Sequence, residues 1–198
     1  MRKISLVLML SLVSAMAAGL PDAERQVLTD HLAKSSQEFL SSVEGLTPEQ
    51  WNYKAGPDRW SIADCAEHIA LSEDFLRELV EGKILTADPS PDRIEARKPL
   101  DEKVLLMITD RSFKAQAPEP LKPSSKFGSP DGAVDHFKES RAETVALAED
   151  RDDLRERAGE HPVFKELDAY QWLLFLSGHT LRHTAQIQEV KASPGFPK

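Results

Sequence analysis

Apolar residues recur about every 3.6 positions along most of the chain, the spacing that places them on one face of an α-helix. The first such stretch runs from residue 22 to residue 45, and Gly45 is of a type that often ends helices. Its apolar positions are Val27, Leu28, Leu32, Phe39, Leu40 and Val43. We therefore predict a first long helix over 22–45.

Local capping signals predict where the next two helices begin. The motif Thr-Pro-Glu-Gln at 47–50 is a capping box with proline at the first helical position, so a short helix carrying Trp51 should follow. Residues 55–58, Ala-Gly-Pro-Asp, then break the chain. Ser61 is placed to cap a second long helix, and Asp64, three residues later, suits the positive end of the helix dipole.

The rest of the chain alternates helical stretches with stretches rich in proline and glycine. The predicted elements are a loop over 81–99, a helix over 100–112, an extended surface connection over 114–131, a long helix from Ser129 to about Gly159, and a last helix from Asp168 to Val190. The run of charged residues from Glu149 to Arg157, within the long helix predicted from Ser129, suits a solvated helix face. No segment has convincing strand character. The predicted fold class is all-α, a bundle of four or five helices with long crossover loops.

The first residues have a different pattern from the rest. A positively charged start, an apolar run over 4–13 and a series of small residues are typical of a secretory signal peptide, cleaved after Ala17 or Ala18. A retained N-terminal anchor is the alternative, but the run is short for a membrane span. We predict a leader at 1–18, export to the periplasm or beyond the cell, and no stable membrane insertion after cleavage.

Composition suits one globular domain over 19–198, since 40% of the 198 residues are hydrophobic and 29% are charged. The formal net charge is −8, and loss of the leader with Arg2 and Lys3 would bring it to −10. Nucleic-acid binding, which needs a basic surface, is therefore not expected. The single cysteine, Cys65, excludes an internal disulfide. A small buried residue is the favoured interpretation of Cys65, and a reactive thiol is the alternative.

Two histidines, His179 and His183, stand four residues apart in the last predicted helix, so their rings should project from one face about one turn apart. Neutral imidazoles suit zinc, nickel, copper or iron, but the pair needs a third ligand. His68 lies beside the apolar stripe of the second long helix and is the candidate. The alternative is three unrelated histidines. His31 is expected at the surface, and His136 has no partner at ligand spacing.

Two motifs at a wide separation carry a resemblance to a known family. They are Trp-Ser-Ile-Ala-Asp at 60–64 leading to Glu-His-Ile at 67–69, and His-Pro-Val-Phe at 161–164 leading through Asp168 and Trp172 to His-Thr-Leu-Arg-His-Thr-Ala-Gln-Ile at 179–187. Together they resemble the DinB-like superfamily of four-helix bundles, over about residues 24–192. This superfamily also contains thiol transferases and the mycothiol-dependent maleylpyruvate isomerase.

The resemblance implies one divalent metal ion, bound by one histidine from the second helix and two from the last. In this chain these ligands are His68, His179 and His183, and zinc or nickel is the expected ion. Three imidazoles leave an open coordination position, as in catalytic sites. The resemblance also implies a possible homodimer, although the sequence shows no exposed apolar stripe that would settle this.

Side chains near the predicted ligands could support the site. Asp64 stands one turn before His68 and Gln186 three residues after His183, so each could orient an imidazole or a bound water. Helix capping is the favoured alternative for Asp64. Arg182 could meet a substrate carboxylate, but a surface position is expected.

Three functions remain open from the sequence. The first is an exported metal-dependent hydrolase or thiol transferase acting on an unknown small molecule, with Asp64 or Glu67 as the only nearby general base, which weakens the case for peptide hydrolysis. Export argues against thiol transfer, because the small thiols of the family are intracellular. The second is a non-catalytic binding module of the cell envelope stabilised by metal. The third is a partner-binding protein with a degenerate metal site.

Overall fold

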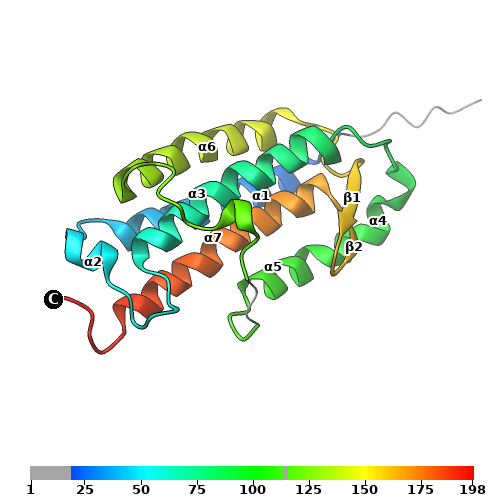
Figure 1. The fold of residues 1–198 in the computed structure, drawn as a ribbon. Helices are drawn as coiled ribbons and strands as arrows, with labels where there is room; N and C mark the ends of the chain where they lie inside the picture. The colour runs from blue at the N-terminus through cyan, green and yellow to red at the C-terminus, as the bar shows by residue number, and fades with distance from the viewer. Residues whose placement is uncertain (1–18, 114–115) are drawn as a thin grey trace, which may run out of the picture.

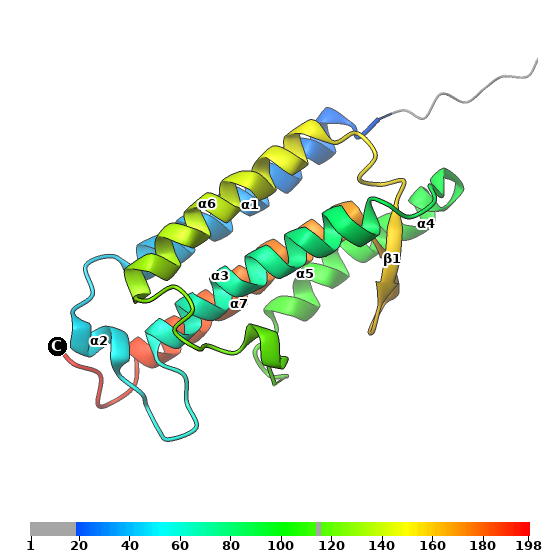
Figure 2. The ribbon, with the colours of Figure 1, turned by 45° about the horizontal axis from the view of Figure 1, so that its top comes forward.

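Four long helices form the body of the protein in a computed structural model that describes residues 19–113 and 116–198. They are α1 (Asp22–Val43), α3 (Ile62–Leu79), α6 (Pro130–Asp150) and α7 (Ala169–Lys191). Both α1 and α3 pack against α6 and against α7 (Figure 1). Figure 2 shows α1 beside α6 and α3 beside α7, with the shorter α5 (Asp101–Thr109) lying along α7. The predicted four-helix bundle is confirmed. The predicted leader at 1–18 lies outside the described residues.

The predicted helix starts are found where the capping signals place them. The capping box at Thr47 begins α2 (Pro48–Asn52), and the one formed by Ser61 and Asp64 begins α3. A third box, formed by Asp168 and Gln171, begins α7. Because each box pairs backbone N–H groups that would otherwise lack partners, these helix starts are determined locally.

The prediction of a helix running to Gly159, with no strand in the chain, is wrong. Helix α6 ends at Asp150, and two antiparallel strands, β1 (Ala158–His161) and β2 (Lys165–Asp168), follow with Ala158 opposite Asp168. The charge run forms a turn, because the Asp153 carboxylate binds both Arg151 and Arg157. Gly159 lies within β1, where Ile84 Cδ1 would be 2.3 Å from an added Cβ, so a larger residue would not fit without a shift.

The prediction of a loop over 81–99 is also wrong. The chain continues from α3 through a π-helical turn, Val80–Ile84, and then through two 3₁₀ turns, Pro91–Arg93 and Lys98–Leu100, on either side of α4 (Ile94–Arg97). The buried Arg97 organises this segment by donating hydrogen bonds to Ser90, Glu166 and the carbonyl of Arg155. Pro91 and Pro99, which suggested a loop, instead occupy the first turn of short helices, where their missing N–H is tolerated.

The core consists of two apolar clusters, one towards each end of the bundle. The cluster towards the hairpin contains Leu28, Leu32 and Leu173, and the other contains Phe39, Phe137, Ile62 and Ile187. Cys65 belongs to the second cluster, and burial raises the pKa of its thiol to about 12. The interpretation of Cys65 as a small buried residue is confirmed. Among residues 19–113 and 116–198, no helix combines the length and apolar character needed to cross a membrane.

Candidate metal centre

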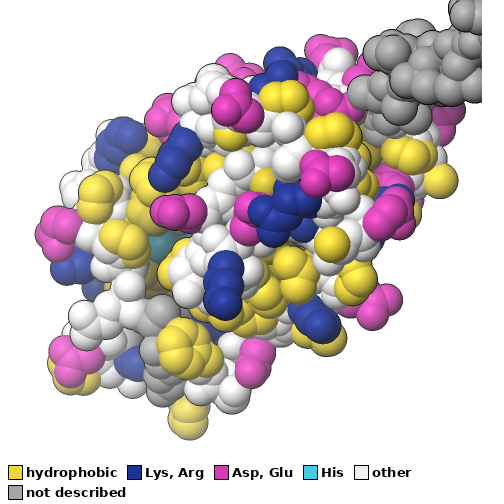
Figure 3. All heavy atoms as spheres, turned by 90° about the vertical axis from the view of Figure 1, so that its right-hand side faces the viewer, with side chains coloured by type: hydrophobic (Ala, Val, Ile, Leu, Met, Phe, Trp, Pro, Cys, Tyr) yellow, Lys and Arg dark blue, Asp and Glu magenta, His cyan; other side chains and the backbone are white. Residues whose placement is uncertain are grey.

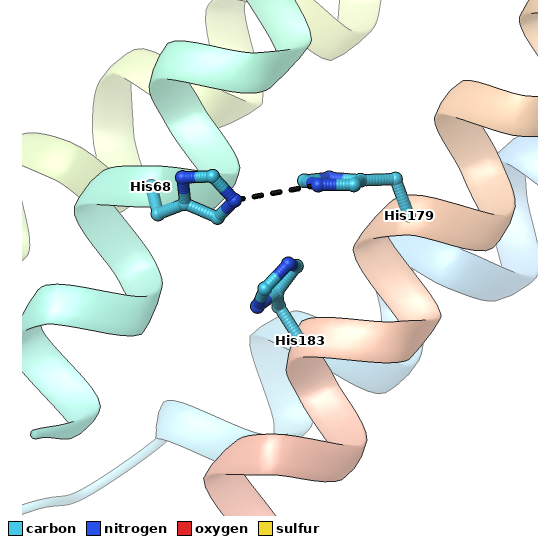
Figure 4. A group of neighbouring side chains, drawn as sticks. All are labelled: His68, His179 and His183. Carbon is cyan, nitrogen blue, oxygen red and sulfur yellow. Dashed lines mark hydrogen bonds between the residues drawn. The ribbon is translucent and has the colours of Figure 1, made fainter. Parts of the chain in front are cut away.

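The three predicted histidines meet between two helices of the bundle. His68 lies in the second turn of α3, and His179 and His183 lie one turn apart on α7. Each histidine offers one ring nitrogen, and these three nitrogens all lie within 4.8 Å of one another. In Figure 4 the three rings point into the same space between α3 and α7. His68 and His183 are buried, whereas His179 is partly exposed, so the group can be reached from outside.

The spacing of these nitrogens fits a metal ion. His68 Nε2 lies 3.3 Å from His179 Nε2. Two imidazole nitrogens on one tetrahedral zinc, each at about 2.0–2.1 Å, would be about 3.3–3.4 Å apart. Without an ion, two nitrogen lone pairs at this distance would repel each other unless one of them carried a proton. The geometry of the residues therefore suits a shared cation.

Hydrogen bonds determine the tautomers of two of the three imidazoles. His68 Nδ1 lies 2.7 Å from the backbone oxygen of Leu121. A carbonyl oxygen only accepts, so Nδ1 carries the proton and donates, which leaves the Nε2 lone pair directed towards the centre. His183 Nδ1 lies 3.0 Å from Oε1 of Gln186. If this amide oxygen is the acceptor, His183 Nδ1 also carries the proton, and its Nε2 is left for a metal ion.

The orientation of the Gln186 amide is itself held by a cation. Arg111 Nη1 donates to Gln186 Oε1 over 3.3 Å, and Arg111 also makes two hydrogen bonds to the carboxylate of Glu189. An arginine can only donate, so the oxygen of the amide, and not its nitrogen, must face Arg111. His183 Nδ1 therefore meets an acceptor and takes the N–H form.

Burial keeps all three imidazoles neutral. It lowers the pKa of His68, lowers that of His183 to about 2, and lowers that of His179 well below its usual value, with a further contribution from His183. Aromatic rings surround the group, since the Trp60 ring centroid lies 4.8 Å from that of His68 and Phe175 stacks on His179 at 6.4 Å. Neutral imidazole is the form that binds metal, so the residues present fit a divalent ion.

Of the three residues predicted to support the site, Gln186 contacts one of the histidines, whereas Asp64 and Arg182 make other contacts. Gln186 contacts His183, as its spacing suggests. The carboxylate of Asp64 accepts the backbone N–H of Ser61 over 2.8 Å and pairs with Lys54 over 2.8 Å, so its role is helix capping. Arg182 donates to the backbone carbonyls of Ile108, near the end of α5, and of Asp110 and Phe113, just beyond it, and is thus not available for a substrate carboxylate.

The remaining histidines lie apart from this group. His136 Nε2 donates to the Asp74 carboxylate over 2.7 Å, and the ring stacks on Phe127, so His136 has a partner on α3 that its sequence position did not reveal. His161 is buried in the hairpin, where its Nδ1 accepts the backbone N–H groups of Val163 and Phe164.

On the face seen in Figure 3, a histidine side chain is visible in a hollow bordered by hydrophobic side chains.

The four-helix bundle described above is the fold of a known superfamily, and the chain belongs to the DinB superfamily. Residues 31–187 match the family model of the DinB superfamily. Among individual proteins, the chain is 29% identical over 155 residues to the uncharacterized protein YuaE of Bacillus subtilis (strain 168), covering 78% of this chain and 91% of YuaE.

A solved structure supports the fold. The chain is similar to YfiT from Bacillus subtilis, described as a probable metal-dependent hydrolase with an unusual four-helix bundle topology. The TM-score is 0.57 with 17% sequence identity, and the match covers 90% of this chain and 91% of YfiT. At this identity the likeness bears on the fold alone.

Proposed function

We propose that the protein is an exported metal-dependent hydrolase that holds one zinc or nickel ion through His68, His179 and His183. The observation that carries the proposal is the convergence of three neutral imidazoles, two of which have their Nδ1–H groups engaged elsewhere. The description of YfiT as a probable metal-dependent hydrolase is consistent with this assignment.

A bound divalent ion would supply Lewis-acid chemistry, by lowering the pKa of water and polarising a carbonyl or phosphoryl oxygen of the substrate. The chain itself supplies a rigid ligand set, because His68 and His183 are each held by a second hydrogen bond. Trp60 and Phe175 add aromatic surface beside the rings. Three protein ligands leave room for a substrate or water.

The acidic residues near the centre limit the range of substrates. Asp64 caps α3, and the carboxylate of Glu67 accepts three backbone N–H groups from residues 124–126. Neither carboxylate is therefore placed to act as a general base. We propose substrates with a good leaving group, such as activated esters, rather than peptides.

The proposed export is compatible with the contacts of the first described residues. Leu20 is buried, and its backbone N–H donates to the carbonyl of Asp152 over 2.9 Å. Cleavage after Ala17 or Ala18 would leave this contact intact, since both cleavage sites precede Leu20. The mass of the protein recovered from a periplasmic fraction should correspond to a chain starting at residue 18 or 19. Recovery of the uncleaved chain, held in the membrane fraction, would contradict the proposal.

Hydrolysis by metal-loaded protein tests the function. The untagged protein, stripped of metal and then reloaded with zinc or with nickel, is assayed on aryl esters and aryl phosphates of low leaving-group pKa. Turnover is expected only with metal and is expected to be lost in His183→Ala. Stoichiometric metal binding without turnover on any of these substrates would instead support the metal-stabilised binding module, which the engagement of Asp64 and Glu67 in backbone hydrogen bonds also favours.

A further inference from the structure

Part of the connection between α5 and α6 packs on α3 and contacts His68 of the candidate metal centre. Residues 119–128, here called the strap, start with the 3₁₀ turn Glu119–Leu121, which packs on α3, and lead to the beginning of α6 (Figures 1 and 2). The carbonyl of Leu121 in this turn accepts the hydrogen bond from His68 Nδ1. The position of the strap thus bears directly on the orientation of one predicted ligand.

Glu67, the residue before His68 on α3, fastens the strap. Its side chain is buried, and its two carboxylate oxygens accept the backbone N–H groups of Ser124, Ser125 and Lys126 over 3.0, 3.0 and 2.7 Å. Successive N–H groups that point to one side form an anion-binding concavity. In this protein a carboxylate of the chain itself occupies the concavity.

The conformation of the strap depends on such an attachment. Ser125 has a φ of +62°, in the left-handed region that residues with a side chain rarely adopt. Such a conformation persists where surrounding contacts hold it. Ser125 is exposed, so its hydrogen bond to Glu67 and the turn closed by Gly128 N–H on the Ser125 carbonyl are what hold it.

We propose that Glu67 is a positioning residue of the metal centre. By holding residues 124–126, it keeps the Leu121 carbonyl against His68 Nδ1, which selects the Nδ1–H tautomer and leaves Nε2 free for the ion. The effect on metal affinity rests on the proposed function. The effect on the His68 tautomer does not, since it exists in the metal-free protein.

Two variants disrupt the attachment from its two sides. In Glu67→Gln the amide keeps one acceptor oxygen and turns an NH₂ donor towards backbone N–H groups, so part of the attachment is lost. In Ser125→Pro the N–H donor is removed and a positive φ is forbidden. Glu119→Gln, at an exposed strap residue whose carboxylate pairs only with Lys122 in the described structure, is the matched control.

Two measurements read out the proposal: zinc affinity by competition with a chromophoric chelator, and the ¹⁵N shifts of the His68 ring in metal-free protein. Glu67→Gln and Ser125→Pro are each expected to weaken zinc binding about 10- to 100-fold, and the double variant should be no worse than the more affected single one. The His68 ring should change from one tautomer to a mixture. Glu119→Gln should match wild type in both.

The outcomes separate this proposal from the proposed function. Wild-type zinc affinity and an unchanged His68 tautomer in Glu67→Gln and Ser125→Pro would overturn the positioning role. If Glu67→Gln does not fold, Ser125→Pro decides alone, because it changes an exposed residue. If wild-type protein binds no zinc, the proposed function fails, and the His68 tautomer in the variants still decides the role of Glu67.

Discussion

Replacing His179 with alanine is expected to abolish stoichiometric metal binding while preserving the helical fold. His179 supplies the nitrogen 3.3 Å from that of His68, so it links the α3 ligand to the α7 pair. Its loss leaves two ligands on different helices. Removing a residue that merely orients a ligand already weakens metal binding about 10- to 100-fold, so the loss of a ligand should exceed about 100-fold.

The measurement is zinc or nickel titration of the metal-stripped protein, followed by metal content and by the thermal shift that metal produces. Metal that binds the folded protein raises its melting temperature by mass action, and this increase should disappear in His179→Ala. His136→Ala is the control, because His136 pairs with Asp74 and stacks on Phe127, apart from the centre. Retained affinity in His179→Ala, with one ion per chain, would exclude the three-histidine site.

Local signals made the helix starts predictable from the sequence. The capping boxes at Thr47 and Ser61 need only residues within one turn, so they can be recognised without tertiary information. The end of the first helix was predicted to within two residues from Gly45, since glycine often ends helices. In the structure Gly45 follows the helix with a φ of +69°. The hairpin at 158–168 was not predictable in this way, because its four-residue strands are too short for an alternating pattern to appear.

The predicted site likewise combines residues that local sequence patterns reveal with groups that only tertiary packing brings together. The pair at His179 and His183 follows from helix periodicity, and His68 was found beside the apolar stripe of its helix. Among the groups that orient these rings, Gln186 was predicted from its spacing to His183, but the Leu121 carbonyl and Arg111 were missed. The Leu121 carbonyl is a backbone atom with no sequence signature, and Arg111 reaches Gln186 only because α5 lies along α7. Such partners depend on tertiary packing, which periodicity does not encode.

A buried ion pair one turn beyond His68 joins the four long helices. Nε and Nη2 of Arg141, on α6, donate to the two carboxylate oxygens of Glu73, on α3, each over 2.7 Å. Arg141 also donates to the Leu32 carbonyl on α1 and to Thr180 on α7, next to His179. Glu73 is 1% exposed and Arg141 4%, so both charges are out of water.

Replacing Glu73 with leucine is therefore expected to destabilise the metal-free protein by about 3–5 kcal/mol, because it leaves the Arg141 guanidinium buried without its counter-ion. The double variant Glu73→Leu with Arg141→Met should lose much less than the two single losses added together, since no uncompensated charge remains. Urea unfolding followed by circular dichroism measures all three free energies of unfolding.

Lys138→Met is the matched control for this pair. Lys138 lies on the same helix, three residues before Arg141, and pairs with Asp135 at the surface over 2.9 Å. An exposed pair of this kind contributes about 0–1 kcal/mol, so its loss should barely move the urea midpoint. Additive losses in the double variant, or a Glu73→Leu effect as small as that of Lys138→Met, would show that the pair is not a coupled unit. Non-additivity would instead identify Glu73 and Arg141 as one coupled unit that joins α3 to α6.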